Sequence, residues 1–130
     1  MVRVLIKADS RFPVNRKKIR QLIKSMLRES GVEGEIEIGV CVVGDRKMKT
    51  LNQRYLKRDE TAIILTFPLE NTGESSGLGF VDFPDDVLRL GDIVISYPQV
   101  LKKAAEENVL VDNIIEDLVK YGLRCLLEVE

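Results

Sequence analysis

Hydrophobic and polar positions alternate with a period of two in two stretches of the chain, a pattern typical of strands in a sheet. The alternation predicts strands over residues 2–8 and 36–43, and two short, mainly apolar segments predict further strands over 62–67, which Pro68 ends, and 90–95. The second stretch ends in an unbroken apolar run, so we expect a central strand whose second half is buried on both faces.

Apolar residues spaced three and four positions apart predict a first helix between the first two strands. Asn15 is a candidate N-cap, and Gly31 lies where a helix C-terminus favours glycine. The apolar stripe of this helix is expected to pack against a sheet. It consists of Ile19, Leu22, Ile23, Met26 and Leu27.

The same periodicity predicts a short second helix that begins at Asp45, directly after the second strand. This helix is expected to run through Tyr55. Its inward-facing residues are predicted to be Met48, Leu51 and Tyr55.

Two more helices complete the pattern. Ser96 and Gln99 form an S-x-x-Q capping box at the start of the third helix, and Asn108 is its expected end. The last helix is predicted from about Asn113 to the end of the sequence. Its buried stripe is expected to contain Ile115, Leu118, Val119, Gly122 and Leu126.

Four strands and four helices in 130 residues predict one α+β domain that spans residues 1–130. A Gly-, Ser- and Asp-rich loop over 69–89 is longer than compact domains usually contain. Its Asp82, Asp85 and Asp86 could bind Mg²⁺ or act as acid and base, but we favour a solvated acidic loop. For Asp92 we expect a structural role, capping a helix or anchoring the loop.

Composition narrows the chemistry. The chain contains no histidine, which excludes histidine-based metal binding and acid–base catalysis. Cys41 and Cys125 lie in apolar stretches and are expected to be buried free thiols, which fits a reducing cytoplasm. No apolar run reaches the roughly 18 residues of a membrane span, and residues 1–6 are too few for a signal peptide, so we expect no leader and no membrane partner.

Charge is divided unequally along the chain. Residues 1–58 contain 15 Lys or Arg and 6 Asp or Glu, whereas residues 59–130 contain 5 and 15. The basic half is a candidate polyanion-binding surface, and the alternative is that charged helix faces merely solvate the fold.

The candidate RNA-binding residues form two groups in this basic half. A cationic ridge is predicted on the outer face of the first helix, and it contains Lys17, Arg20, Lys24 and Arg28. A cationic cluster is predicted on and after the second helix, and it contains Arg46, Lys47, Arg54, Lys57 and Arg58. Only seven aromatic residues are present and none is Trp, so we expect contacts to the RNA backbone rather than to bases.

Three stretches of the sequence match, in order, the motifs of a known family. They are L-N-Q-R-Y at 51–55 with L-T-F-P at 65–68, then L-G-D-I-V-I-S at 90–96, and finally the last helix over 116–127. On these motifs the chain resembles the YbeY family of small metal-dependent endoribonucleases, which act in ribosomal RNA maturation and ribosome quality control. The resemblance implies a four-stranded mixed sheet with about four helices packed on it, the metalloprotease-type fold of that family.

The resemblance also implies that the zinc site of the family is incomplete. Two family histidines four residues apart on the last helix correspond to Tyr121 and Cys125, and the third would fall one residue beyond Glu130. On the other side of the cleft, a family arginine, threonine and aspartate are replaced. Their positions hold Leu56, Ala62 and Ile63. We therefore expect no zinc and no metal-dependent hydrolysis.

The leading interpretation is a YbeY-like protein that binds ribosomal RNA or a ribosome-associated protein through its basic half. One alternative is residual endoribonuclease activity through a rearranged metal site that includes Cys125 and loop carboxylates, or through ligands beyond Glu130. Another is a regulatory or structural partner of an intact homologue.

Overall fold

The computed structural model describes residues 1–69 and 87–128. Strands and helices follow in the order β1 (Val2–Ala8), α1 (Arg16–Glu29), β2 (Glu35–Val43), α2 (Asp45–Leu56), β3 (Ile64–Pro68), β4 (Val87–Ser96), α4 (Tyr97–Glu107) and α5 (Val111–Glu128). The expected strands and helices are therefore confirmed, with shifts of a few residues at their ends. Most of the predicted loop, with Asp82, Asp85 and Asp86, lies outside the described residues.

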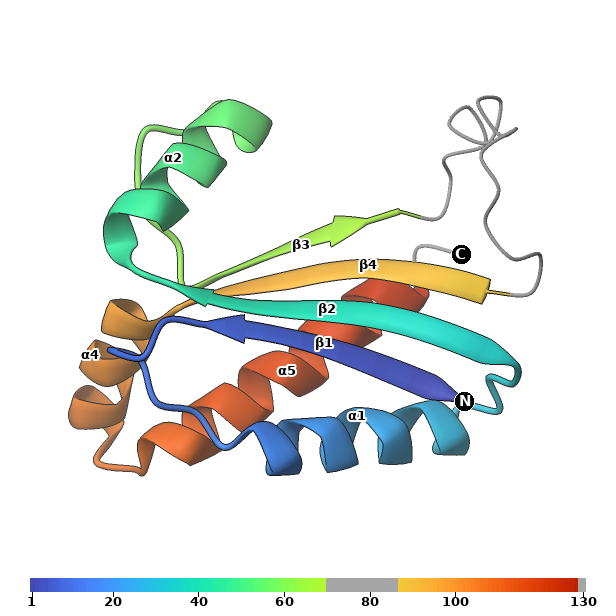
Figure 1. Ribbon diagram of the computed structural model, residues 1–130. Coiled ribbons are helices and arrows are strands. Elements are labelled where there is room, and N and C mark those ends of the chain that lie inside the picture. Colours follow the sequence, from blue (N-terminus) through green and yellow to red (C-terminus); the bar gives the residue numbers. More distant parts are fainter. Residues whose placement is uncertain (70–86, 129–130) are drawn as a thin grey trace.

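The strands form one mixed sheet in the order β1-β2-β4-β3. β1 is parallel to β2 and β2 to β4, while β3 runs antiparallel to β4 along the far edge. The α+β class and the four-stranded mixed sheet are thus confirmed, and β2 is an inner strand as predicted (Figure 1).

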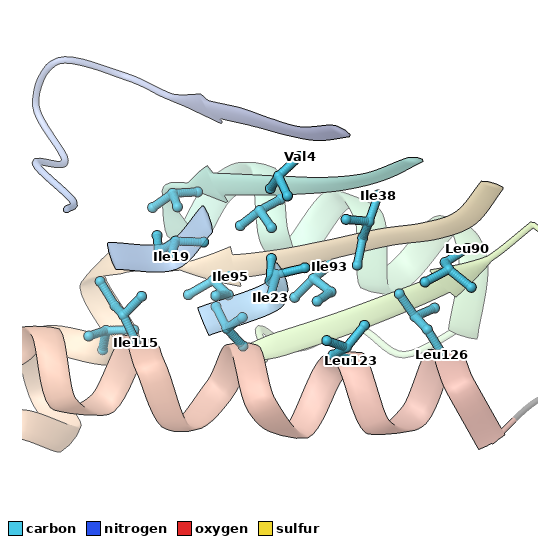
Figure 2. Close-up of a cluster of buried hydrophobic side chains, with 14 of the residues drawn as sticks. Val4, Ile19, Ile23, Ile38, Leu90, Ile93, Ile95, Ile115, Leu123 and Leu126 are labelled. Atoms are coloured by element: carbon cyan, nitrogen blue, oxygen red, sulfur yellow. The ribbon is translucent and has the colours of Figure 1, made fainter. Parts of the chain in front are cut away.

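The main core lies between the sheet and two helices, α1 and α5, which cover the same face (Figure 1). Ile19 and Ile23 reach this core from α1, and Ile115, Leu123 and Leu126 reach it from α5 (Figure 2). The opposite face is covered by α2 at one end, where Met48 packs in a smaller cluster with Leu65 and Val94. The helices that the structure describes therefore leave much of that second face uncovered, since α4 lies at the end of the sheet (Figure 1). We call this second face the open face.

The burial of β2 differs from the prediction. Its side chains alternate between buried and half-buried from Ile36 to Val43, so the second half is not fully buried on both faces. Cys41 and Val43 lie on the less covered face, beside the cluster around Met48. An apolar run indicates two covered faces, but it does not reveal that α2 covers only the end of one face.

The helix caps are confirmed in part. Asn15 Oδ1 accepts a hydrogen bond from the Lys18 backbone N–H at 3.0 Å, as expected for an N-cap. Ser96 Oγ accepts one from the Gln99 N–H at 3.4 Å, but the Gln99 amide donates to Asp45 instead of completing a capping box. The last helix begins at Val111, two residues before the predicted start.

The start of α2 is tied to two distant segments through Asp45. Its Oδ1 accepts hydrogen bonds from Ser96 Oγ at 2.8 Å, Thr61 Oγ1 at 3.2 Å and Gln99 Nε2 at 3.2 Å. Burial raises the pKa of Asp45, but these hydrogen bonds outweigh it and hold the pKa below its usual value. The ionised carboxylate therefore fixes α2 against the N-terminus of α4 and the segment before β3.

The end of α2 is fixed by a buried asparagine. Asn52 is 1% exposed, and its Nδ2 donates to the Glu60 carbonyl at 2.8 Å. The backbone carbonyl of Asn52 accepts a hydrogen bond from the Arg58 N–H at 3.3 Å. Lys57 has a positive φ of 59° at the C-cap. The turn that carries Lys57 and Arg58 is therefore held by hydrogen bonds.

Candidate functional site

Two of the positions that the resemblance assigns to the family's metal cleft meet beside the edge strand β3. Tyr121 of α5 and Leu56 of α2 line the same hollow, of about 490 Å³, with Tyr55 and residues of β3. Its lining consists of Tyr55, Leu56, Ile64, Leu65, Thr66, Phe67 and Tyr121, and we call it the aromatic hollow. Two of the substituted positions, 65 residues apart in the sequence, are thus brought together by the fold.

The remaining substituted positions do not line this hollow. Ala62 packs in the small cluster around Met48, and Ile63 packs against the main core. Cys125 lies one turn after Tyr121 on α5 and is half-buried and free. Both cysteines are free thiols as predicted, but each is half-buried rather than fully buried.

The side chains at these positions do not fit a zinc ion. Zinc in proteins takes three or four Cys, His or carboxylate ligands, and here the α5 positions supply one thiol and one phenol. Within residues 1–69 and 87–128, no three His, Cys, Asp or Glu side chains gather at one point. Hydrogen bonding with Cys125 is the main cause that raises the pKa of Tyr121, which keeps the phenol neutral.

Tyr55 is exposed, which corrects the prediction that it faces inward. Its side chain is 55% exposed, and its ring meets Phe67 edge to face with a centroid distance of 5.2 Å. Helical periodicity placed it on the stripe with Met48 and Leu51, but Tyr55 lines the hollow of about 730 Å³ beside the sheet instead of packing in a core. The end of this apolar stripe therefore faces solvent.

The cations of the basic half divide into paired and unpaired groups. Five of the 15 are engaged: Arg3, Arg11, Lys18 and Lys49 form ion pairs, and Arg16 donates to the carbonyls of Ile6 and Ala8. In the part of the chain that the structure describes, the other ten have no ion pair. These ten are Lys7 and the nine predicted RNA-binding residues, Lys17, Arg20, Lys24, Arg28, Arg46, Lys47, Arg54, Lys57 and Arg58.

The ridge and the cluster lie on opposite sides of the sheet, because α1 covers one face and α2 the other (Figure 1). Arg20 of the ridge lines a hollow of about 560 Å³, and Lys47 of the cluster lines one of about 730 Å³. The two hollows share Lys7, Cys41 and Asp92. They are therefore contiguous, and Lys7 lies between the two cationic groups.

Lys7 is a candidate contact that sequence reasoning missed. The alternation of β1 places Val4 and Ile6 on the core face, so Lys7 lies on the opposite face with Leu5. That alternation was available in the sequence, but the position of β1 at the edge of the sheet was not. Edge position leaves Lys7 exposed next to the open face.

Asp92 lies on the same open face, pressed into the space above Gly39. The two residues are register partners in β2 and β4, and a Cβ at Gly39 would overlap Asp92 Oδ1. Burial is the main cause that raises the pKa of Asp92, and the Glu37 carboxylate adds to it. Within the described residues Asp92 caps no helix, so one of its two predicted roles is wrong.

The thiol of Cys41, which lines both hollows, is held in its neutral form. Burial raises its pKa first, Asp92 raises it further, and Lys7 and Lys47 oppose the shift in part. A thiol with a raised pKa is a poor nucleophile. The open face therefore offers no activated cysteine.

A solved structure with the same fold places the chain in a structural class. It is the solution structure of a protein from Thermotoga maritima, which shares 21% identity and a TM-score of 0.57, over 95% of this chain and 69% of that one. This likeness agrees with the α+β class of the chain.

The sequence comparisons identify the family. The family model described as "Endoribonuclease YbeY" matches residues 6–125. The protein named "Endoribonuclease YbeY" in Acinetobacter baumannii is 30% identical over 125 residues, which cover 94% of this chain and 75% of that protein. The Dehalococcoides mccartyi protein of the same name is 25% identical over 129 residues, covering 97% and 81%. The chain belongs to the YbeY family.

Among the described residues, no helix is long and apolar enough to cross a membrane.

Proposed function

We propose that this member of the YbeY family binds RNA through its unpaired cations and does not hydrolyse it with a metal ion. The proposal rests on which cations have partners. Five cations of the basic half form ion pairs or hydrogen bonds, whereas ten form no ion pair among the described residues, and these ten include all nine predicted contacts. Cations with no carboxylate partner are free to neutralise phosphates, which releases counterions and drives binding.

The ribosome supplies the partner in this proposal. The relatives of this chain are named endoribonucleases, and the family resemblance points to ribosomal RNA or a ribosome-associated protein as its partner.

Free Cys41 and Cys125 support a reducing compartment, the cytoplasm, as the location of this protein. We propose that binding requires no cofactor; for zinc, this is supported by the lack of a three-ligand cluster within residues 1–69 and 87–128.

Binding is tested by fluorescence anisotropy with a labelled single-stranded RNA across a salt series. Each phosphate contact contributes about −0.7 to the slope of log K against log salt for single strands. We expect Lys57→Gln with Arg58→Gln to make the slope shallower by about 1.4, since two contacts are lost, and Lys17→Gln with Lys24→Gln to have the same effect. Lys103→Gln is the matched control, because Lys103 is already paired with Glu107 at 2.7 Å.

Two results would refute RNA binding by these cations. One is a binding constant that does not change with salt in the unaltered protein. The other is the same slope in the control and in both double variants, because the cations would then contact no phosphate.

Hydrolysis is tested separately by incubating a labelled single-stranded RNA with the protein and added Zn²⁺, with and without a chelator. We expect no cleavage above the buffer blank in either arm. Cleavage that a chelator abolishes would instead support the alternative of a rearranged metal site that includes Cys125.

A further inference from the structure

The floor of the larger hollow on the open face is a row of side chains across three strands. Lys7 of β1 is the register partner of Cys41 in β2, and Cys41 is the partner of Val94 in β4. All three line the hollow, whose volume of about 730 Å³ falls within the roughly 300–1,000 Å³ of small-ligand sites. We call it the open-face hollow. Its floor therefore changes from a cation at the β1 edge to apolar groups at the inner strands.

One side of α2 forms the wall of the open-face hollow. Lys47, Leu51 and Tyr55 follow one another at intervals of four residues, which aligns them along one side of the helix, and all three line the hollow. They span about 12 Å along the helix axis, at about 1.5 Å per residue. The Tyr55 ring meets the ring of Phe67, which also lines the hollow, at a centroid distance of 5.2 Å. The wall, like the floor, thus begins with a cation, and it ends with aromatic rings.

The two amines of the hollow act on the same point. Burial and Asp92 raise the pKa of the Cys41 thiol, and the ammonium groups of Lys7 and Lys47 both oppose that increase, so both lie near this sulfur. Neither lysine forms an ion pair in the described part of the chain. Two cations in a hollow with apolar walls create a field that attracts an anion.

Two carboxyl groups also line the hollow, but they do not cancel this field. Asp9 Oδ1 is paired with Arg11 Nε at 3.2 Å and accepts a hydrogen bond from the Arg11 backbone N–H at 2.9 Å. Burial, and then the Glu37 carboxylate, raises the pKa of Asp92, so its charged form is disfavoured. The end of the hollow that holds the two amines is therefore positive, and the end that holds the rings is apolar.

We propose that the open-face hollow binds a small amphiphilic organic anion, with its anionic head between Lys7 and Lys47 and its apolar body along the wall toward the Tyr55 ring. The head is a carboxylate or a phosphate monoester, and the body is about 12 Å long, the length of the wall. This site shares only Tyr55 and Phe67 with the aromatic hollow. The inference goes beyond RNA binding, because the apolar wall has no part in phosphate contacts.

The test uses two fluorescent probes that have the same rings and differ in charge. Anilinonaphthalene sulfonate is an anion, phenylnaphthylamine is its uncharged counterpart, and both emit strongly in an apolar site. We expect the protein to bind one equivalent of the sulfonate and to bind the uncharged probe more weakly. Octanoate or octyl phosphate should displace the sulfonate and thereby identify the preferred head group, whereas octanol should not displace it.

Substitution of the lysines tests the position of the anionic head. Lys7→Gln with Lys47→Gln should weaken binding of the sulfonate by about 5- to 30-fold, because two charge pairs are lost. Binding of the uncharged probe should not change. Lys49→Gln with Lys103→Gln is the matched control, because it removes the same charge from two exposed lysines that do not line the hollow, and it should affect neither probe.

Substitution of the tyrosines tests the position of the apolar body. Tyr55→Ala should weaken binding of both probes, and its folding is checked by far-ultraviolet circular dichroism. Tyr121→Ala should weaken neither, because Tyr121 lines the aromatic hollow and not the open-face hollow. A bound ligand should also slow alkylation of Cys41, which lies in the floor, and leave the alkylation rate of Cys125 on α5 unchanged.

Four results would overturn the inference. They are equal affinity of the unaltered protein for the two probes, the same sulfonate affinity in the Lys7 and Lys47 variant as in its control, displacement by octanol as effective as by either anion, and loss of binding in Tyr121→Ala. RNA binding is measured separately through its salt dependence. A protein that binds RNA but not the sulfonate would lose only this inference, and the opposite result would refute only the proposed function.

Discussion

Gly91 sets the position of the edge strand β3, and replacing it with alanine should reveal how closely β3 packs on β4. Gly91 has a φ of 134°, which side-chain-bearing residues rarely adopt, and it follows the β-bulge opposite Glu37 and Ile38. A Cβ at this position would overlap the Phe67 carbonyl and crowd Pro68 Cα. Both atoms belong to the backbone, so neither can move without shifting β3.

The expected cost has two parts. Placing alanine at this φ costs about 1–3 kcal/mol, and the clash with β3 adds about 1–3 kcal/mol more, as for overpacked sites. Gly34→Ala is a matched control, since Gly34 has a φ of 99° and a Cβ there would meet nothing within 4 Å. Gly91→Ala should therefore lower the free energy of unfolding by about 2–6 kcal/mol and Gly34→Ala by only about 1–3 kcal/mol.

Urea unfolding followed by far-ultraviolet circular dichroism measures both values without relying on Trp, which the chain lacks. With a slope of about 1–3 kcal/mol per molar urea, a difference of about 2 kcal/mol shifts the midpoint by about 1 M. Equal costs for the two variants would refute the reasoning, because β3 would then not pack against Gly91. A folded Gly91→Ala variant should also show a displaced Phe67 and a reshaped aromatic hollow.

Three further predictions concern the core and two carboxylates. Leu123→Ala should lower the free energy of unfolding by about 2–5 kcal/mol, because Leu123 is fully buried; urea titration would show a loss under 1 kcal/mol if α5 were misplaced. Asp45→Ala should cost about 1.5–3 kcal/mol by orphaning the buried Ser96 hydroxyl. Because the pKa of Asp45 is lowered on folding, its contribution is present above the unfolded value of about 3.9 and is lost as pH falls through the folded value. Asp92 behaves oppositely, because its pKa is raised on folding and its ionised form is unfavourable in the folded protein. Asp92→Asn should therefore increase the free energy of unfolding at neutral pH but not near pH 3. The same change in that free energy at both pH values would contradict this.

The sequence predicts the elements of this fold well because each carries its own local pattern. The stripe from Ile19 to Leu27 and the alternation over Val2–Ala8 both match the structure, and Asn15 caps α1 as its side-chain chemistry indicates. The order of strands in the sheet depends on long-range pairing, and no local pattern encodes it. The mixed four-stranded sheet was expected from the resemblance to the YbeY family, and the order of its strands was not predicted.

Side chains whose surroundings come from distant segments were predicted less well. Leu118 is only partly buried, although its spacing on α5 matches that of the core residues. Gln99 bonds to Asp45, 54 residues earlier in the sequence, rather than to its own helix. Tyr55 continues the stripe of α2 but lines a hollow beside the sheet, where its side chain stays 55% exposed. For Leu118 and Tyr55 periodicity gave the helix face, and for Gln99 the motif gave the helix start; in all three the surrounding segments decided the contacts.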